Sequence, residues 1–524
     1  MKFVSDPPIA VKIRKMKQRV RWQEPIIVER EIDQTRLAFC DRISDNPEFS
    51  FLVIGDSGSG YHQKHNPQRE IAEQMLAHLE SCRFVLHTGD VIYLVGSSEY
   101  YHKNFIEPYR EFIVGGEQPE RIAYDQMVFK YPFLPIPGNH DYYDLPVFYG
   151  LLTGSTRLLR NLLPSRLDLD VGWHGSYQGK AYAKAFLDYL QGIASKEDLI
   201  RHLDRHYTGK TQTGRCLLYE PDRFTRLPNR YYTFRTGGID FFALDSNTFN
   251  APLPIPKTKE GEDYRQSLKK RRNELEQQKQ QILEASNKLN PESPEGAEQL
   301  DDMRSKLAQI EELEVDIDKQ LAADVTTVTD DEQLNWLQKR LIESWHTQEV
   351  RGRVIYFHHP PYVTEATKWH QAQTLAIRYR LRQVLDAVSE AVGSLAQGRP
   401  LVDLILSGHA HCLEYLRTED TGHADSHLNW IVCGGSGHSL RRQRREGPDL
   451  MEKFSEVEGN DTRLVARSQL YLGRNGRGSQ TRRPYSFLRI DVAGGQQPKF
   501  RVQPLITERF RRDWNYSTVE PFTI

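Results

Sequence analysis

Polar side chains that can bind a metal ion follow five apolar, strand-like runs of the chain. The loops that carry them are GDSG (55–58), GDVIY (89–93), GNHD (138–141), FHHPPY (357–362) and GHAH (408–411). Any one of these Asp, Asn, His or Tyr residues alone is explained as a helix cap, a turn residue or a core histidine. Five such loops at apparent strand ends are harder to explain in that way. Because ligands of α/β sheets bind at the carboxyl ends of strands, the pattern predicts one shared site.

The first loop, within FLVIGDSGSGYHQ (51–63), raises two alternatives: a backbone cradle for phosphate, or an aspartate that binds a metal ion. A phosphate-binding P-loop ends in Gly-Lys-Ser/Thr, but Tyr61 stands where the lysine is needed. The glycines fall as G-x-x-G-x-G, which is not the dinucleotide-binding order G-x-G-x-x-G. With both phosphate-binding patterns excluded, Asp56 is the residue of this loop that could bind a metal ion. From this loop alone, a role for Asp56 in a turn or as a helix cap stays open.

The elements that would position these loops alternate between strands and helices. Residues 49–58, 83–93 and 133–143 each begin as a strand, and a helix is predicted over 69–82. Further strands are predicted within 229–249, 353–362, 402–416, 429–440, 486–492 and 499–505, and further helices over 330–345 and 377–392. The β-α-β order predicts an α/β fold in which helices cover a sheet.

The composition is typical of a soluble globular protein. In the 524 residues, 70 Lys plus Arg balance 71 Asp plus Glu, so no overall charge points to nucleic acid or to an anionic membrane. The five cysteines form no C-x-x-C pair, which suits a reducing compartment better than a disulfide framework. No apolar run approaches ~20 residues, and the first residues lack the core of a signal peptide. We therefore expect a cytoplasmic protein without a membrane span.

Residues 263–322 carry a heptad pattern in a charged, Gln-rich background. The apolar seam consists of Leu268, Leu275, Ile282 and Leu289 before the breaker NPESPEG, and of Leu300, Met303, Leu307, Ile310, Ile317 and Leu321 after it. Glu314 fills one seam position. Two heptad helices joined by a short Pro/Gly loop predict an antiparallel coiled-coil hairpin. Two interpretations stay open: an arm for a protein partner or for self-association, and an insertion whose helices only bury each other.

In their order along the chain, the five loops resemble the motifs of the calcineurin-like metallophosphoesterases, and within that superfamily those of the purple acid phosphatases. Most of the superfamily begins with D-x-H, whereas this chain has D-S-G and places Tyr93 four residues after Gly89, as the purple branch does. The flanking segments LPNRYYTF, FFALDSNT and QLNWLQKRL also look like that superfamily. The resemblance covers about 50–255 and 326–500.

The resemblance implies an α/β fold built as a two-sheet (αββα) metallophosphoesterase sandwich, with the antiparallel helical hairpin inserted into it. The expected parts are an N-terminal extension (1–48), the first half of the domain (49–255) with an insertion at about 145–228, the coiled-coil hairpin (256–325), and the second half with C-terminal strands (326–524).

By motif position, the resemblance also implies a site for two metal ions. Asp56, Tyr93 and His411 would hold the first ion, Asp90 would bridge both, and Asn139, His358 and His409 would complete the second. A phenolate is a hard anionic ligand, so Tyr93 implies Fe(III) at the first position, with Fe, Zn or Mn at the second. His140 would be the general acid or the hydrogen-bond donor to the leaving oxygen, and His359 is a candidate substrate contact.

The implied reaction is hydrolysis of a phosphate monoester by metal-bound hydroxide, because two adjacent ions lower the pKa of a bound water and clamp the attacking and leaving groups. Two alternatives stay open: a phosphodiesterase for a nucleotide or a lipid head group, and a noncatalytic protein that interacts through the hairpin. The expected partner is a phosphorylated substrate, with no membrane and no indication of nucleic acid.

Several further residues are weaker candidates. His370, His438 and the basic run 441–445 could line the cleft, with ordinary surface roles as the alternative. Asp245 matches a strand end of the superfamily without being a ligand, so we expect a structural role for it.

Overall fold

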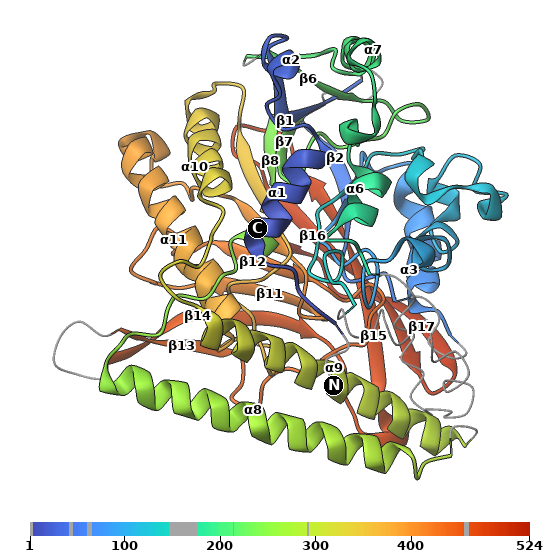
Figure 1. The fold of residues 1–524 in the computed structure, drawn as a ribbon, viewed down its shortest axis with the longest axis vertical. Helices are drawn as coiled ribbons and strands as arrows, with labels where there is room; N and C mark the ends of the chain where they lie inside the picture. Colours follow the sequence, from blue (N-terminus) through green and yellow to red (C-terminus); the bar gives the residue numbers. More distant parts are fainter. Residues whose placement is uncertain are drawn as a thin grey trace.

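The computed structural model describes residues 4–40, 46–59, 65–145, 175–212, 214–290, 293–454 and 461–524. In these ranges the chain forms two β-sheets with helices packed on them, so the predicted α/β two-sheet fold is confirmed (Figure 1). The helices are α1 (Ile9–Arg19), α2 (Pro25–Val28), α3 (Pro67–Leu79), α6 (Lys180–Phe186), α7 (Lys196–His206), α8 (Lys259–Ser286), α9 (Pro294–Ala322), α10 (Asp331–His346) and α11 (Ala372–Val392). The strands are β1 (Ile32–Phe39), β2 (Phe49–Ile54), β3 (Val85–His87), β4 (Phe133–Pro135), β5 (Gly209–Thr211), β6 (Gly214–Tyr219), β7 (Tyr232–Thr236), β8 (Ile239–Ala243), β9 (Gly352–Tyr356), β10 (Leu404–Ser407), β11 (Leu413–Thr418), β12 (Asn429–Cys433), β13 (Asp449–Phe454), β14 (Asp461–Leu472), β15 (Arg482–Val492), β16 (Phe500–Phe510), β17 (Asp513–Thr518) and β18 (Phe522–Thr523).

The smaller sheet contains seven strands within the described residues. Six of them follow the order β17-β16-β15-β2-β3-β4, and β18 pairs with β16. β2, β3 and β4 run parallel, and β15 joins β2 in the antiparallel sense. Every residue of β2 is buried, as expected for a near-continuous apolar strand whose two faces are both covered.

The larger sheet has eleven strands in the part of the chain that the structure describes, in the order β13-β14-β11-β12-β10-β9-β8-β7-β1-β6-β5. β8, β9, β10 and β12 are parallel neighbours in the middle of this sheet. The five polar loops follow β2, β3 and β4 in one sheet and β9 and β10 in the other. Both sheets therefore deliver polar residues from the carboxyl ends of their parallel strands.

Aromatic rings pack the two sheets against each other. Phe51 of β2 meets Phe241 of β8 with ring centroids 5.6 Å apart, and Phe84, directly before β3, lies 5.3 Å from the same ring. Phe234 of β7 stacks on Phe241 at 4.7 Å. Such buried aromatic contacts add specific geometry to hydrophobic burial, so they help to fix one sheet relative to the other.

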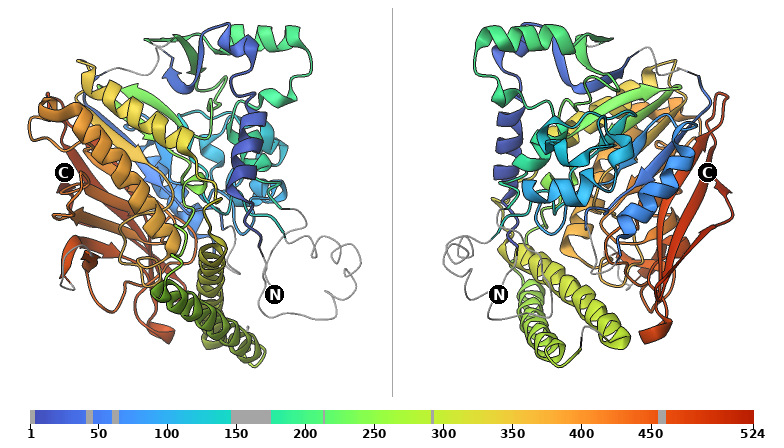
Figure 2. Two further views of the ribbon diagram at one scale, coloured as in Figure 1. Left: turned by 60° about the vertical axis from the view of Figure 1, so that its left-hand side comes forward. Right: turned by 90° about the vertical axis from the view of Figure 1, so that its right-hand side faces the viewer.

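Helices cover the sandwich on its outer sides (Figure 2). α10 and α11 pack side by side on the larger sheet, where Arg353 of β9 lies 3.8 Å from the ring centroid of Trp345 in α10. α3 packs on β15 and β16 of the smaller sheet. Among the helices that the structure describes, none combines the length and the apolar composition needed to cross a bilayer.

The segment predicted as an N-terminal extension contributes a strand to the larger sheet. β1 pairs in parallel with both β6 and β7, and Met16 of α1 is buried in the main hydrophobic core. The predicted insertion at 145–228 contains α6, α7, β5 and β6, while its residues 146–174 lie outside the described residues.

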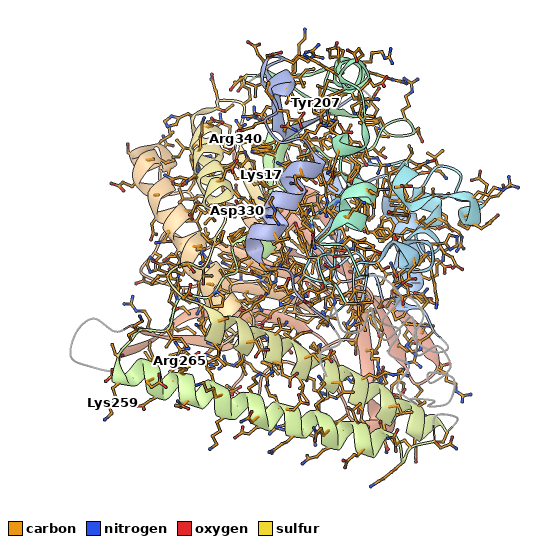
Figure 3. The ribbon with its side chains drawn as sticks, viewed as in Figure 1. Lys17, Tyr207, Lys259, Arg265, Asp330 and Arg340 are labelled. Carbon is orange, nitrogen blue, oxygen red and sulfur yellow. The ribbon has the colours of Figure 1, made fainter. Side chains whose placement is uncertain are left out.

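The two heptad segments form the long helices α8 and α9, which run antiparallel at one end of the molecule (Figure 1). Arg265, labelled near the start of α8 in Figure 3, donates to the carbonyl oxygen of Leu321 near the end of α9 at 3.2 Å. Further along the pair, Lys279 of α8 lies 3.4 Å from Glu314 of α9. Figure 1 shows that α9 lies between α8 and the sheets.

Candidate metal centre

Loops from both sheets meet in one buried cluster. Asp56 follows β2, Asp90 follows β3, His358 follows β9, and His409 and His411 follow β10. None of these five side chains is more than 7% exposed. All except His358 have positive φ angles, between 37° and 66°. Non-glycine residues adopt this conformation only when the surrounding structure requires it, and such positions gather at functional sites.

The GNHD loop wraps closely around the carboxylate of Asp90. The backbone N–H of His140 donates to Asp90 Oδ1 at 2.8 Å. A Cβ atom on Gly138 would collide with both the backbone nitrogen and the carboxylate of Asp90. The close approach of these two loops therefore requires glycine at position 138.

The Tyr93 hydroxyl lies among three potential ligands. Tyr93 Oη is 2.9 Å from Asp56 Oδ1, 2.8 Å from Asp90 Oδ2 and 3.1 Å from His411 Nε2. A phenol has one proton to donate, so it satisfies only one of the two carboxylates. The acceptor oxygens of Asp56 and Asp90 around the Tyr93 hydroxyl therefore outnumber the protons that this hydroxyl can donate to them.

His358 links Asp90 to the GNHD loop. His358 Nε2 is 2.9 Å from Asn139 Oδ1 and 3.3 Å from Asp90 Oδ2. On the other side of the ring, His358 Nδ1 is 2.8 Å from the carbonyl oxygen of Thr88. Because a carbonyl oxygen only accepts, Nδ1 carries a proton and Nε2 is the nitrogen that faces the cluster.

Two groups of potential ligand atoms share Asp90. Asp56, Asp90 and His411 form one group, and Asp90, His358 and His409 form the other; within each group the ligand atoms lie within 4.8 Å of one another. A carboxylate common to two such groups suits a pair of adjacent ions.

Burial and neighbouring charges perturb the acids of the cluster. Burial, reinforced by the charge of Asp90, raises the pKa of Asp56 to about 7. Burial also opposes ionisation of Asp90, but the charges of His358 and His140 hold its pKa below the ordinary value. Two carboxylates this close cannot both ionise without a compensating positive charge, which a metal cation supplies.

The donor set fits metal ions. The seven predicted ligands offer carboxylate, phenol, carboxamide and imidazole atoms, which are the hard and intermediate donors that iron, zinc and manganese accept. Asn139 directs its oxygen at His358, and its buried Nδ2 has no hydrogen-bond partner among the described residues. The structure thus brings the predicted ligands together, and their metal-binding roles remain predictions.

His140 and Asp141 hold the remaining part of the GNHD loop. His140 Nδ1 lies 2.5 Å from the carbonyl oxygen of Leu94, so this nitrogen is the donor. Asp141 accepts hydrogen bonds from the backbone nitrogens of Gly138 at 2.8 Å and Val91 at 3.1 Å. Asp141, which the sequence did not single out, therefore ties the GNHD and GDVIY loops together.

The weaker histidine candidates occupy different surroundings. His359 is buried and its Nδ1 lies 2.8 Å from Ser246 Oγ, so one ring nitrogen is already engaged inside the protein. His370 is exposed. His438 lies in the cluster, with its Nδ1 3.2 Å from His411 Nδ1.

Asp245 belongs to a buried ion network. Arg230 Nη1 lies 3.3 Å from Asp245 Oδ2, and Arg230 Nη2 lies 2.5 Å from Oδ2 of Asp330, the residue labelled at the start of α10 in Figure 3. Tyr142 Oη donates to Asp245 Oδ2 at 2.6 Å. The network thus connects the residue after the GNHD loop to α10, in agreement with the structural role predicted for Asp245.

Sequence reasoning missed two charged residues beside the cluster, Lys368 and Glu312. Lys368 Nζ lies 2.8 Å from His409 Nε2, and Glu312 of α9 pairs with Lys368 at 2.7 Å. Arg441, the first residue of the basic run, is buried with its Nε 3.3 Å from His411 Nδ1. Neither Lys368 nor Glu312 stands in a motif, so no local signal could have revealed them.

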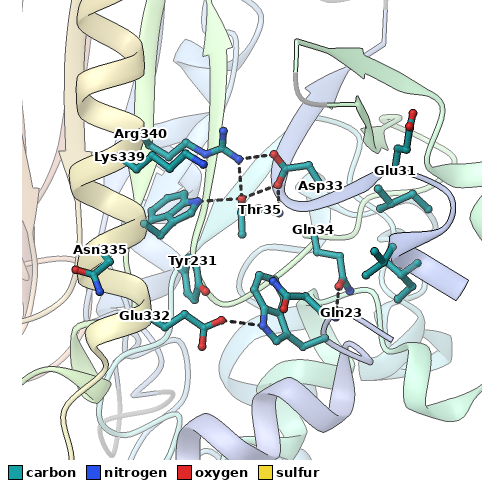
Figure 4. A pocket seen from close by; sticks show the side chains of 15 residues that line it. Gln23, Glu31, Asp33, Gln34, Thr35, Tyr231, Glu332, Asn335, Lys339 and Arg340 are labelled. Carbon is teal, nitrogen blue, oxygen red and sulfur yellow. Dashed lines mark hydrogen bonds and ion pairs between the residues drawn. The ribbon is translucent and has the colours of Figure 1, made fainter. Parts of the chain in front are cut away.

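A separate cavity of about 680 Å³ lies between α10 and the segment that contains β1 (Figure 4). Trp22 Nε1 donates to Glu332 at 2.9 Å, and Arg340 pairs with Asp33 across this cavity. None of the seven predicted ligands lines it. The cavity is therefore distinct from the cluster at the strand ends.

A two-sheet α/β sandwich whose strand-end loops converge on Asp, Asn, His and Tyr has the architecture of a metallophosphoesterase. The sequence model of the calcineurin-like phosphoesterase family matches residues 49–210. The calcineurin-like family resemblance inferred from the motifs is thus confirmed over this part of the chain. No protein with a curated description matches the sequence.

Three of the solved structures that match this chain cover most of it. A purple acid phosphatase from yellow lupin (Lupinus luteus) seeds is 12% identical with a TM-score of 0.40, and the match covers 91% of this chain and 54% of that one. GAP50, the anchor in the inner membrane complex of Plasmodium, is 11% identical with a TM-score of 0.36 over 90% of this chain and 88% of its own. PhoD is 11% identical with a TM-score of 0.38, and the match covers 92% of this chain and 70% of PhoD. The chain thus spans about half the length of the lupin protein.

Proposed function

We propose that this protein is a dinuclear-metal phosphoesterase whose main activity is hydrolysis of phosphate monoesters. The family match over residues 49–210 supports phosphoester hydrolysis as the reaction class. The observation that carries the metal pair is that Asp90 belongs to both groups of ligand atoms.

In this proposal, the two groups hold one ion each. Asp56, Tyr93 and His411 would hold the first ion and Asn139, His358 and His409 the second, with Asp90 shared by both sets. When bound, two such ions lower the pKa of a water molecule and neutralise charge on the phosphoryl oxygens. The tyrosine favours Fe(III) at the first position, with Fe, Zn or Mn at the second.

His140 is positioned to give a proton to the leaving oxygen. Its Nδ1 is occupied by the hydrogen bond to Leu94, so the protonated imidazole offers its second N–H at Nε2. A positioned acid of this kind typically contributes roughly 10²- to 10⁴-fold to the rate.

The first experiment measures metal content and the visible spectrum of the purified chain, its Tyr93→Phe variant and a Tyr379→Phe control. Tyr379 is 45% exposed on α11, so its replacement leaves the cluster intact. Two ions per chain including iron, with a visible band that disappears only in Tyr93→Phe, would support the tyrosinate-iron assignment. Two colourless ions would remove iron from the proposal, and failure to bind metal after reconstitution would refute the centre.

The second experiment compares kcat/KM for p-nitrophenyl phosphate and for bis(p-nitrophenyl) phosphate. We expect faster hydrolysis of the monoester and a loss of about 10²-fold in kcat for His140→Gln. A clear preference for the diester would replace the proposed monoesterase with a phosphodiesterase. Absence of hydrolysis in a metal-loaded chain would favour a noncatalytic role.

A further inference from the structure

A carboxylate from the helical hairpin lies against the candidate metal centre. Glu312 of α9 accepts from Lys368 Nζ at 2.7 Å through Oε2, and from Arg441 Nη2 at 3.0 Å through Oε1. The same two cations contact potential ligands: Lys368 reaches His409, and Arg441 reaches His411. Because these histidines belong to different ligand groups, the Lys368–Arg441 pair spans the two halves of the centre.

Lys368 and Arg441 are deeply buried positive charges. Each side chain is 1% exposed, and the side chain of Glu312 is 14% exposed. Buried charges require a counter-charge, and Glu312 provides one carboxylate oxygen to each cation. If α9 moved away, the Lys368–Arg441 pair would become an anion-binding site.

The rest of α9 also binds the body of the protein through polar contacts. Asp316 accepts from the backbone nitrogens of Ala372 at 2.8 Å and Gln373 at 2.9 Å, at the start of α11. Nearer the start of α9, Asp301 pairs with Arg483 at 2.6 Å. Arg441 Nη1 additionally donates to a backbone carbonyl of α9, that of Ser305, at 2.7 Å. These groups would face water if the helix left, so water would take the place of the lost hydrogen-bond partners.

The apolar residues of the hairpin form their own cores. Leu300 and Leu307 of α9 pack against Ile282 and Leu283 of α8 and against Leu289, which follows α8. Leu275, Ile310 and Ile317 form a second cluster. Both clusters are separate from the main core. Releasing α9 from the sheets therefore leaves these apolar side chains buried against each other. The segments 250–258 and 323–330 that connect the hairpin to the body contain neither helix nor strand, although Ala251, Ile255 and Asp330 within them are buried. A displacement of the hairpin would therefore bend these segments without breaking a helix or a strand.

We propose that Lys368 and Arg441 bind the phosphate group of the substrate, and that Glu312 occupies their anion site until the hairpin is displaced. The inference rests on the proposed phosphoesterase function, because that function makes phosphate the ligand. A carboxylate and a phosphate both present paired oxygen acceptors to lysine and arginine. Glu312 is thus an internal competitor of the substrate, and α9 is an inhibitory element.

Titration calorimetry with inorganic phosphate tests this directly on the full chain, with metal content matched between variants. Glu312→Gln removes the competing charge and should tighten phosphate binding at least tenfold. Glu284→Gln, at an exposed position of α8, is the matched control and should bind like the wild type. Adding Lys368→Met or Arg441→Met to the Glu312→Gln variant should abolish the gain. Equal affinities of the wild type and Glu312→Gln would overturn the proposal.

Hydrogen exchange gives a second measurement that needs no variant. The amides of Ala372 and Gln373 donate to Asp316, so they should exchange faster in the wild type when phosphate saturates the site and displaces α9. Unchanged exchange at saturating phosphate would overturn the displacement. Because phosphate binding requires no turnover, a Glu312→Gln variant that binds tightly but hydrolyses nothing would keep the anion site and reject the proposed function.

Discussion

Replacing Arg230 tests how the buried ion network stabilises the protein next to the metal centre. Arg230 is 2% exposed and is the common partner of two buried carboxylates, Asp245 and Asp330. Arg230→Met keeps much of the side-chain volume but leaves both carboxylates without their cation. Removal of one partner of a buried ion pair typically costs ~3–5 kcal/mol, so we expect the free energy of unfolding to fall by about 4 kcal/mol at pH 7.5.

The size of this loss should depend on pH. Burial opposes ionisation of Asp330, but the charge of Arg230 holds its pKa below the ordinary value. In the wild type, the lowered pKa stabilises the folded state above the unfolded-state pKa, and this contribution disappears as the pH falls through the folded-state value. In Arg230→Met, burial raises the pKa of Asp330, so keeping the carboxylate ionised at neutral pH becomes costly. The difference between variant and wild type should therefore be larger at pH 7.5 than at pH 5.

Urea unfolding followed by tryptophan fluorescence measures this loss as a shift of the midpoint at constant slope. Arg467→Met is the control, because Arg467 and its partner Asp449 are 49% and 41% exposed, and it should leave the midpoint unchanged. A cycle with Asp330→Asn should show that the losses from Arg230→Met and Asp330→Asn are not additive. A wild-type midpoint for Arg230→Met, or strictly additive losses, would refute the reasoning.

Two further variants probe the loop contacts and the hairpin. Gly138→Ala should abolish binding of at least one metal ion, measured by elemental analysis, because the added methyl group would push the GNHD loop away from Asp90; full metal content would contradict the required close approach. Burial raises the pKa of Glu311 in α9 to about 7 despite the charge of Lys279, so the folded state holds this proton more tightly than the unfolded state. Stability should therefore fall by about 3 kcal/mol as the pH rises from 4.5 to 8, because the stabilisation from the pKa difference between the folded and unfolded states is lost over this range. Glu311→Gln should lose this dependence in thermal unfolding, and an identical pH profile in the variant would argue against it.

The loops of the candidate centre could be predicted because each is encoded locally. An apolar run followed by Gly-Asp places Asp56 and Asp90 at strand ends, and a spacing of four residues from Gly89 identifies Tyr93. The backbone around these residues is also local, since glycines and positive φ angles occur within the same short loops. The resemblance then supplied the order in which the loops meet, which no single loop encodes.

The charged residues around the centre could not be predicted because their partners are distant in sequence. Glu312 lies off the heptad seam, two residues after Ile310, so the periodicity places it on the polar face of α9. A polar helix face is normally solvated, and nothing local distinguishes one that docks on another part of the protein. For the same reason, the buried position of Arg441 within a run of exposed-looking basic residues depends on its contacts with α9.

The strand β1 could not be predicted from the sequence for a different reason. Gln34 and Thr35 are buried although they are polar, because Gln34 donates to the carbonyl oxygen of Val20 and Thr35 accepts from the indole of Trp336. These satisfied polar side chains interrupt the apolar alternation by which a strand is predicted. A segment without that alternation was therefore predicted as an extension, although its strand lies inside the larger sheet.

The hairpin combines two requirements that a single helix cannot meet. α9 must present charged residues to the body, so that Glu312 can reach Lys368 and Arg441, yet its opposite side carries Leu300, Leu307, Ile310 and Ile317. An isolated helix leaving the site would expose these apolar side chains to water, at about 1.5–3 kcal/mol for each fully buried one. α8 covers them in both positions of the hairpin, so the cost of release is reduced to polar contacts that phosphate and water can replace. Under the proposed displacement, the heptad seam would keep these side chains buried whether α9 is docked on the body or released from it.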